Sequence, residues 1–135
     1  MKHHVITIRS IGQSVGAAGR CISSGQKFGL DIKMFDAVTP SDNPVDMAID
    51  LGINVQGFRE IYSRYDNCVA AFMSHFTLWS MCLEQKEEFT IFEHDAIIVN
   101  DIPEYLPYKE VCSLGKPCYG KWNDPKTFGV NPLTS

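Results

Sequence analysis

The sequence predicts a three-layer α/β domain that contains a mostly parallel sheet. Short runs rich in β-branched residues alternate with helical segments from the first residues onward, which favours βαβ units. One long segment, residues 67–84, is apolar on nearly all sides of a helix, so it must lie between a sheet and another layer. The length of 135 residues and the apolar content of 44% suit one globular domain, and we expect residues 1–135 to form it.

A βαβ unit is expected at the start of the chain. Residues 5–8 form a β-branched run that predicts a strand, and the glycine-punctuated segment after it turns helical towards Lys27. Gly29 suits the end of this helix. Apolar residues within 32–38 predict a second strand, which stops at the turn-forming cluster 39–44.

Residues 45–64 carry two short helical patterns, 45–51 and 55–62, which are separated at Gly52. Neither pattern has strong periodicity. We therefore expect this segment to be an excursion from the core rather than a part of it.

A longer helix follows, and Asp66 or Asn67 is expected to cap its N-terminus. Its apolar residues recur at helical spacing, and Trp79 is expected in the core. The helix also has a second apolar side. That side consists of Ala70, Ala71, Leu78 and Met81. Because a soluble monomer rarely exposes a contiguous apolar patch of more than a few hundred Å², we expect a homodimer to cover this side.

Two further strands are expected at 89–92 and 96–99, and a last one at 111–114. The tripeptide Glu93-His94-Asp95 lies between the first two of these strands. In an extended segment the side chains at i and i+2 point to the same side, so Glu93 and Asp95 can share one hard cation, Mn²⁺ or Mg²⁺. Such acidic pairs are also common in solvated turns, and the tripeptide alone leaves both interpretations open.

Charge and termini exclude several classes of protein. A net charge of −4 without clustered Lys or Arg argues against a nucleic-acid partner. The first strand begins close to Met1, which leaves no room for an apolar signal region, and no apolar span of about 18 residues occurs later. We therefore expect a cytoplasmic protein without a membrane span. The five cysteines form no CxxC pair and are expected to be reduced thiols.

Two stretches, residues 67–79 and 89–96, together resemble glycosyltransferase family 25. That family includes bacterial lipooligosaccharide galactosyltransferases and procollagen galactosyltransferases. Its pattern is a helix that bears Ser-His and then Trp, a short connector, and an apolar strand that ends in an acidic motif. In this sequence the pattern reads Ser74-His75, Trp79, the strand at 89–92 and then Glu93-His94-Asp95-Ala96.

The resemblance implies a nucleotide-diphospho-sugar transferase fold of the GT-A type, which is Rossmann-like. It also implies transfer of a hexose, galactose or glucose, from a UDP-sugar donor to a saccharide or other hydroxyl acceptor with inversion at the anomeric carbon. Mn²⁺ or Mg²⁺ would be held by Glu93 and Asp95 and would stabilise the departing diphosphate. No residue is assigned as the general base.

Several residues are expected at the nucleotide-sugar site. Arg9 and Ser10 follow the first strand, where they form either a contact to the nucleotide or a plain surface loop. The remaining candidates follow from the resemblance. They are Val38 and Thr39 after the second strand, Ser74 and His75 on the helix, and His94 in the acidic motif. For His75 the alternative is a core histidine, and the resemblance assigns it to holding the backbone of the donor site.

The sequence departs from the family pattern at several points. His94 stands where the family has a second acidic residue, and Asn67-Cys68 replaces the Gly-Glu that opens the helix. The family fold also continues past the acidic motif, so we expect the acceptor half to be short or missing. The alternative function is a non-catalytic nucleotide-binding or subunit-contact remnant. A metal-dependent phosphohydrolase is a third interpretation, but it would need additional carboxylates and histidines.

Overall fold

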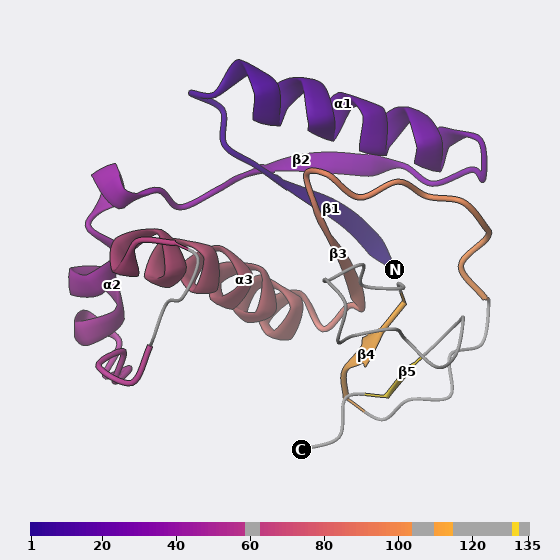
Figure 1. Ribbon diagram of the computed structural model, residues 1–135. Coiled ribbons are helices and arrows are strands. Elements are labelled where there is room, and N and C mark those ends of the chain that lie inside the picture. Colours follow the sequence, from indigo (N-terminus) through magenta and orange to yellow (C-terminus); the bar gives the residue numbers. More distant parts are fainter. Residues whose placement is uncertain (59–62, 104–109, 115–130, 133–135) are drawn as a thin grey trace. The chain divides into compact units, whose positions relative to one another are not determined.

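The computed structural model describes residues 1–58, 63–103, 110–114 and 131–132, and its ribbon is shown in Figure 1. The chain divides into two compact units, Met1–Val99 and Asn100–Ser135. Each unit is described below by itself. The expectation of one domain over residues 1–135 stays a prediction.

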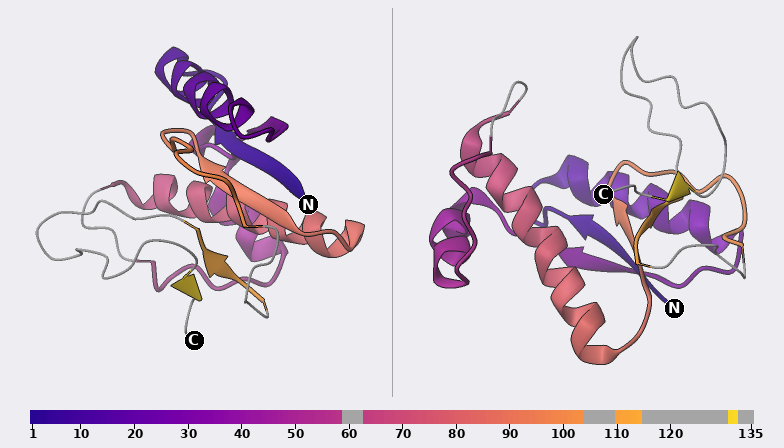
Figure 2. Two further views of the ribbon diagram at one scale, coloured as in Figure 1. Left: turned by 90° about the vertical axis from the view of Figure 1, so that its right-hand side faces the viewer. Right: turned by 90° about the horizontal axis from the view of Figure 1, so that it is seen from below.

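The first unit is built on a parallel sheet of three strands, β1 (Lys2–Thr7), β2 (Ile32–Asp36) and β3 (Phe89–Glu93), in the order β2-β1-β3. Helix α1 (Gly12–Gln26) covers one face of the sheet, and helix α3 (Tyr65–Gln85) covers the other (Figures 1 and 2). This arrangement confirms the predicted α/β class and the parallel sheet. The described part of the chain contains no helix that is long and apolar enough to cross a membrane.

The β1–α1–β2 unit forms where the sequence predicts it. Helix α1 ends at Gln26, and Gly29 follows with a φ of 73°, a backbone conformation that favours glycine. The N–H of Leu30 donates to the carbonyl of Gly25 at 3.1 Å, which closes the helix end. A Cβ at Gly25 would lie 2.4 Å from Ile32 Cδ1, so the glycine allows the helix to approach β2 closely.

The strand register determines which side chains form the core under α1. Val5 of β1 pairs with Met34 of β2 and with Phe92 of β3, so the three side chains share one face of the sheet. This face packs against Ala18 and Cys21 of α1, both fully buried. The alternation of side chains along each strand therefore directs every second residue towards α1 and the others towards α3.

Residues 45–58 contribute to a second core, and the expectation of an excursion outside the core is wrong for this segment. The helix at 45–51 is present as α2 (Pro44–Asp50), and its Ala48 is fully buried. Ala48 and Val55 pack with Val69 and Met73 of α3.

The second helical pattern, 55–62, is not helical over 55–58, and its remaining residues lie outside the described part of the chain. The hydroxyl of Tyr65 donates to the carbonyl of Val55 at 3.0 Å, which fixes this turn instead.

Helix α3 differs from the prediction at its start and on its outer side. It begins at Tyr65 after Arg64, whose side chain makes no capping bond, so neither Asp66 nor Asn67 is the cap. Leu78 is fully buried, whereas the Trp79 side chain is 45% exposed. Consecutive residues are turned by about 100° around a helix, so Leu78 and Trp79 lie on different sides of α3, and Trp79 is one turn from His75, whose ring it contacts. Trp79 is therefore not a core residue.

The apolar side that was expected to need a dimer partner is largely covered within the chain. Ala70 and Leu78 are buried and Met81 is half-buried, although Ala71 is exposed. The exposed large apolar side chains of α3 are Tyr65 near its start and Trp79 and Leu83 further along, the last at 79%. The homodimer stays a prediction, and any such contact would involve a different side of the helix.

The strand predicted at 96–99 is absent. His94 and Asp95 form a turn in which the N–H of Ala96 donates to the carbonyl of Glu93 at 3.0 Å. The chain then runs along the α1 side, where Ala96 and Ile98 pack on the core. The N–H of Ile98 donates to the Ser24 hydroxyl at 2.9 Å, so a helix side chain replaces the ladder bond of a strand.

The second unit contains a short antiparallel pair, β4 (Cys112–Ser113) and β5 (Asn131–Pro132), in which Cys112 pairs with Pro132. The strand predicted at 111–114 thus corresponds to β4.

Leu78 and Trp79 provide a direct test of the helix orientation. Leu78→Ala is expected to lower the free energy of unfolding by about 2–5 kcal/mol, because it leaves a cavity where no side-chain surface is exposed. Trp79→Ala is expected to lower it by only about 1 kcal/mol, since the half-exposed ring packs edge-on against Phe72. Urea unfolding measures both values. A larger loss for Trp79→Ala would place this ring in the core after all.

Candidate functional site

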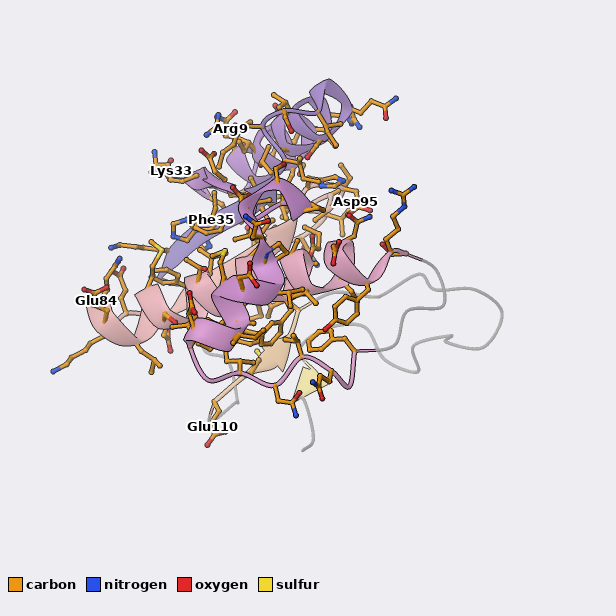
Figure 3. The ribbon with its side chains drawn as sticks, turned by 90° about the vertical axis from the view of Figure 1, so that its left-hand side faces the viewer. Arg9, Lys33, Phe35, Glu84, Asp95 and Glu110 are labelled. Carbon is orange, nitrogen blue, oxygen red and sulfur yellow. The ribbon has the colours of Figure 1, made fainter. Side chains whose placement is uncertain are left out.

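Most of the predicted site residues follow the C-terminal ends of the three strands, and Figure 3 labels two of them, Arg9 and Asp95. The strand order β2-β1-β3 places a topological switch point between β1 and β3, and open α/β sheets bind ligands outside the carboxyl ends of the strands at such points. Arg9 and Ser10 follow β1, Val38 and Thr39 follow β2, and His94 and Asp95 follow β3. Residues from three separate segments therefore meet at one edge.

His75 and Glu93 form a short polar contact between α3 and the end of β3. The His75 Nε2 lies 2.7 Å from Oε1 of Glu93, the last residue of β3. Glu93 alternates onto the α3 face of its strand, which brings its carboxylate to the helix. The hydrogen bond from His75 is the main reason that the pKa of Glu93 lies below its usual value, and the nearby charges of His75 and His94 add to this while burial opposes it.

Ser74 is fully buried, and both of its hydrogen bonds go to the backbone. Its Oγ accepts the N–H of Val38 at 2.9 Å and donates to the carbonyl of Ala70 at 3.0 Å. The residue thus acts on the site through the backbone of Val38. A buried polar group with both partners in place is also a stable arrangement, because no hydrogen-bonding capacity is lost on folding.

The segment after β2 is held by its own side chains. Thr39 begins a 3-10 turn, η1 (Pro40–Asp42), and both its N–H and its hydroxyl donate to Oδ2 of Asp42 at 2.7 Å. The Thr39 hydroxyl lies 3.1 Å from that of Ser41. The hydrogen bonds from Thr39 lower the pKa of Asp42. The predicted site residue Thr39 therefore belongs to a small polar unit rather than a free loop.

Arg9 forms an ion pair with Asp36, the last residue of β2. Both side chains are largely exposed, at 54% and 71%, so the pair contributes little to stability. It does orient the guanidinium towards β2. Sequence reasoning missed Asp36 as a site residue, although a charged residue that ends a buried strand is a recognisable signal.

Ser10 lies exposed in the turn after β1. Ser14, which sequence reasoning also missed, accepts the N–H of Ile8 at 2.9 Å and so holds the start of this turn. No simple signal in the sequence distinguishes Ser14 from the other serines of α1.

Glu93 and Asp95 interact with different helices. Glu93 hydrogen-bonds His75 on α3. On α1, burial is the main cause that raises the pKa of the Cys21 thiol, and the negative charge of Asp95 raises it further. The expectation that the two carboxylates share a side holds for an extended segment, but the chain turns at His94 and Asp95. Asp95 is the second residue of this turn and is exposed (Figure 3). Within the described ranges, no group of three or more His, Cys, Asp or Glu side chains is placed to hold a metal ion.

The role of His75 at Glu93 can be measured without any ligand. His75→Ala removes the hydrogen bond that is the largest cause of the lowered pKa, so the pKa of Glu93 is expected to rise towards its ordinary value. His75→Gln retains an N–H donor, so the pKa of Glu93 is expected to rise less in this variant. Carbon-detected NMR titration of the Glu93 carboxyl follows both variants. An unchanged pKa in His75→Ala would show that the contact does not persist in solution.

Comparison with known proteins connects this edge to a family. Curated protein sequences gave no match. The sequence model of glycosyltransferase family 25, described as LPS biosynthesis protein, matches residues 18–118. This range covers more than half of the chain and includes both Ser74-His75 and Glu93-His94-Asp95. The chain therefore belongs to glycosyltransferase family 25.

Proposed function

We propose that this chain binds a UDP-sugar at the C-terminal edge of its sheet and transfers the hexose, galactose or glucose, to a saccharide or other hydroxyl acceptor. The observation that carries the proposal is the placement of the Ser74-His75 and Glu93–Asp95 motifs at that edge in a member of the family. A GT-A type of fold and inversion at the anomeric carbon belong to the same proposal.

The switch point between β1 and β3 is the proposed place of the diphosphate. Arg9 supplies a positive charge beside it, and the exposure of the Arg9–Asp36 pair leaves the guanidinium accessible to an anion. The exposed Ser10 adds a hydroxyl group after the same strand. Thr39 and Ser41 present hydroxyl groups after β2, which suit the ribose or the base.

Mn²⁺ or Mg²⁺ is the proposed cofactor, held by Glu93 and Asp95. The fit is partial: Glu93 already uses one carboxylate oxygen to bond His75, and Asp95 is exposed after a turn. Two carboxylates make an incomplete shell for such a cation, and the oxygens of a diphosphate would complete it. When bound, the ion would stabilise the negative charge of the departing UDP.

A non-catalytic nucleotide-binding module is the second candidate. His94 in place of a second acidic residue lowers the negative charge of the motif, which favours nucleotide binding over tight metal binding. This candidate shares the UDP site with the first and differs only in the absence of sugar transfer.

Calorimetry with UDP and Mn²⁺ tests the site. Mn²⁺ is expected to bind weakly alone and to strengthen UDP binding, and Glu93→Gln or Asp95→Asn is expected to weaken the Mn²⁺-dependent binding by about tenfold, because each removes one anionic ligand. Asp31→Asn is the matched control, since Asp31 is an exposed carboxylate that precedes β2 at the opposite edge of the sheet. Binding by Asp95→Asn that equals the parent would remove the metal role.

Self-association is also part of the proposal. Trp79 and Leu83 are exposed on the outer side of α3, and two copies could cover them in a symmetric contact. Sedimentation at micromolar concentration is expected to give the mass of a dimer, and Leu83→Lys is expected to shift it towards the monomer. A parent protein that sediments as a monomer would contradict this.

A further inference from the structure

We propose that Ser74 and His75 act together as a brace that fixes the segment after β2 and the end of β3 relative to each other at the proposed donor site. Ser74 holds the segment after β2, and His75 holds the carboxylate at the end of β3. The ligand part of this inference rests on the proposed function. The two residues are positioning residues, since they would act on the ligand through Val38 and Glu93.

The first contact occurs where β2 leaves the sheet. The N–H of Ala37 still donates to the carbonyl of Thr7 at 2.9 Å. The next N–H, that of Val38, donates to the Ser74 hydroxyl at 2.9 Å. Because the same hydroxyl donates its own proton to the carbonyl of Ala70, its lone pairs have a fixed direction. The buried Ser74 thus sets the path of the chain as it leaves β2.

Fixing Val38 also fixes the residues after it. The Val38 side chain packs against the core formed by Ala48, Val55, Val69 and Met73. Thr39 is the next residue, and its two hydrogen bonds to Asp42 make residues 39–42 one unit. The position of the hydroxyl groups of Thr39 and Ser41 therefore depends on the bond between Val38 and Ser74.

The second contact lies on the other side of β1. His75 is adjacent to Ser74 in the helix, yet its partner Glu93 belongs to β3, whereas Val38 follows β2. Strands β2 and β3 both flank β1, so they are separated by two strand spacings, or roughly 10 Å. Two consecutive residues of α3 therefore span the central strand. A shift of the helix would therefore move the segment after β2 and the end of β3 together.

Ser24 provides a matched control for the experiment. Its hydroxyl is buried, accepts the N–H of Ile98 at 2.9 Å and donates to the carbonyl of Cys21 at 2.7 Å. Ser24→Ala thus removes the same pair of bonds as Ser74→Ala, but in α1 and away from the segment after β2. The two variants should lose similar stability, and any difference in ligand binding then reports on position.

Amide hydrogen exchange and UDP titration of the full chain test the brace. Ser74→Ala is expected to speed exchange at Val38 by about tenfold, whereas Ser24→Ala speeds it at Ile98 instead. In the presence of Mn²⁺, Ser74→Ala is expected to weaken UDP binding by about tenfold and Ser24→Ala to leave it unchanged. His75→Ala is expected to weaken it similarly, and His75→Gln to restore part of the loss because its amide can still donate to Glu93.

The outcomes separate the brace from the proposed function. Unchanged exchange at Val38 in Ser74→Ala would overturn the brace whether or not UDP binds. Equal weakening of UDP binding by Ser74→Ala and Ser24→Ala would also overturn it, because general destabilisation would then explain both. If the parent protein bound UDP and His75→Gln lost as much affinity as His75→Ala, the His75 half would be wrong. A parent that does not bind UDP would overturn the proposed function and the ligand part of the brace.

Discussion

The C-terminal edge of the sheet depends on one constraint: the backbone N–H groups that follow the strands need hydrogen-bond acceptors. The hydrogen bond from the Val38 N–H to the Ser74 hydroxyl is an example. A backbone N–H that leaves a parallel sheet loses its ladder partner, and inside a protein it must find another acceptor. In this chain buried helix serines supply the acceptors, each at 2.9 Å: Ser14 for Ile8, Ser74 for Val38 and Ser24 for Ile98. Short hydroxyl side chains suit this task because they add little volume where helix and sheet are closely packed.

Charges at the C-terminal edge are arranged in pairs that remain open to solvent. Arg9 pairs with Asp36 and His75 bonds Glu93, and three of these four side chains are more than half exposed. The Arg9–Asp36 pair is exposed on both sides and contributes little stability, so its geometry costs little to change when a charged ligand arrives. The edge thus combines a backbone that buried serines hold in place with an arginine that can exchange partners. That combination supports the proposed diphosphate site.

The opposite edge of the sheet has a different character. His3 Nδ1 and His4 Nε2 are buried without a hydrogen-bond partner in the described part of the chain. Burial is the main cause that lowers the pKa of both histidines, whose rings lie beside Phe92 and Phe89. Lys2 meanwhile bonds Gln85 and Glu87, where α3 leads into β3. These contacts join the strand and helix ends at this edge.

The sequence by itself determined the order β1–α1–β2–α3–β3, the parallel sheet and the two motifs of the site, because hydrophobic periodicity, Gly29 and local motif spacing are properties of neighbouring residues. Only the tertiary structure decided which side of α3 meets the sheet, and so buried Leu78 while exposing Trp79. It also paired Arg9 with Asp36 across 27 positions and Ser74 with Val38 across 36. The tertiary structure also decided the turn at His94 and Asp95, because Ala96 and Ile98 pack against the core under α1 instead of forming the expected strand. Such contacts depend on packing between segments that are distant in the sequence, and a local sequence pattern does not predict them.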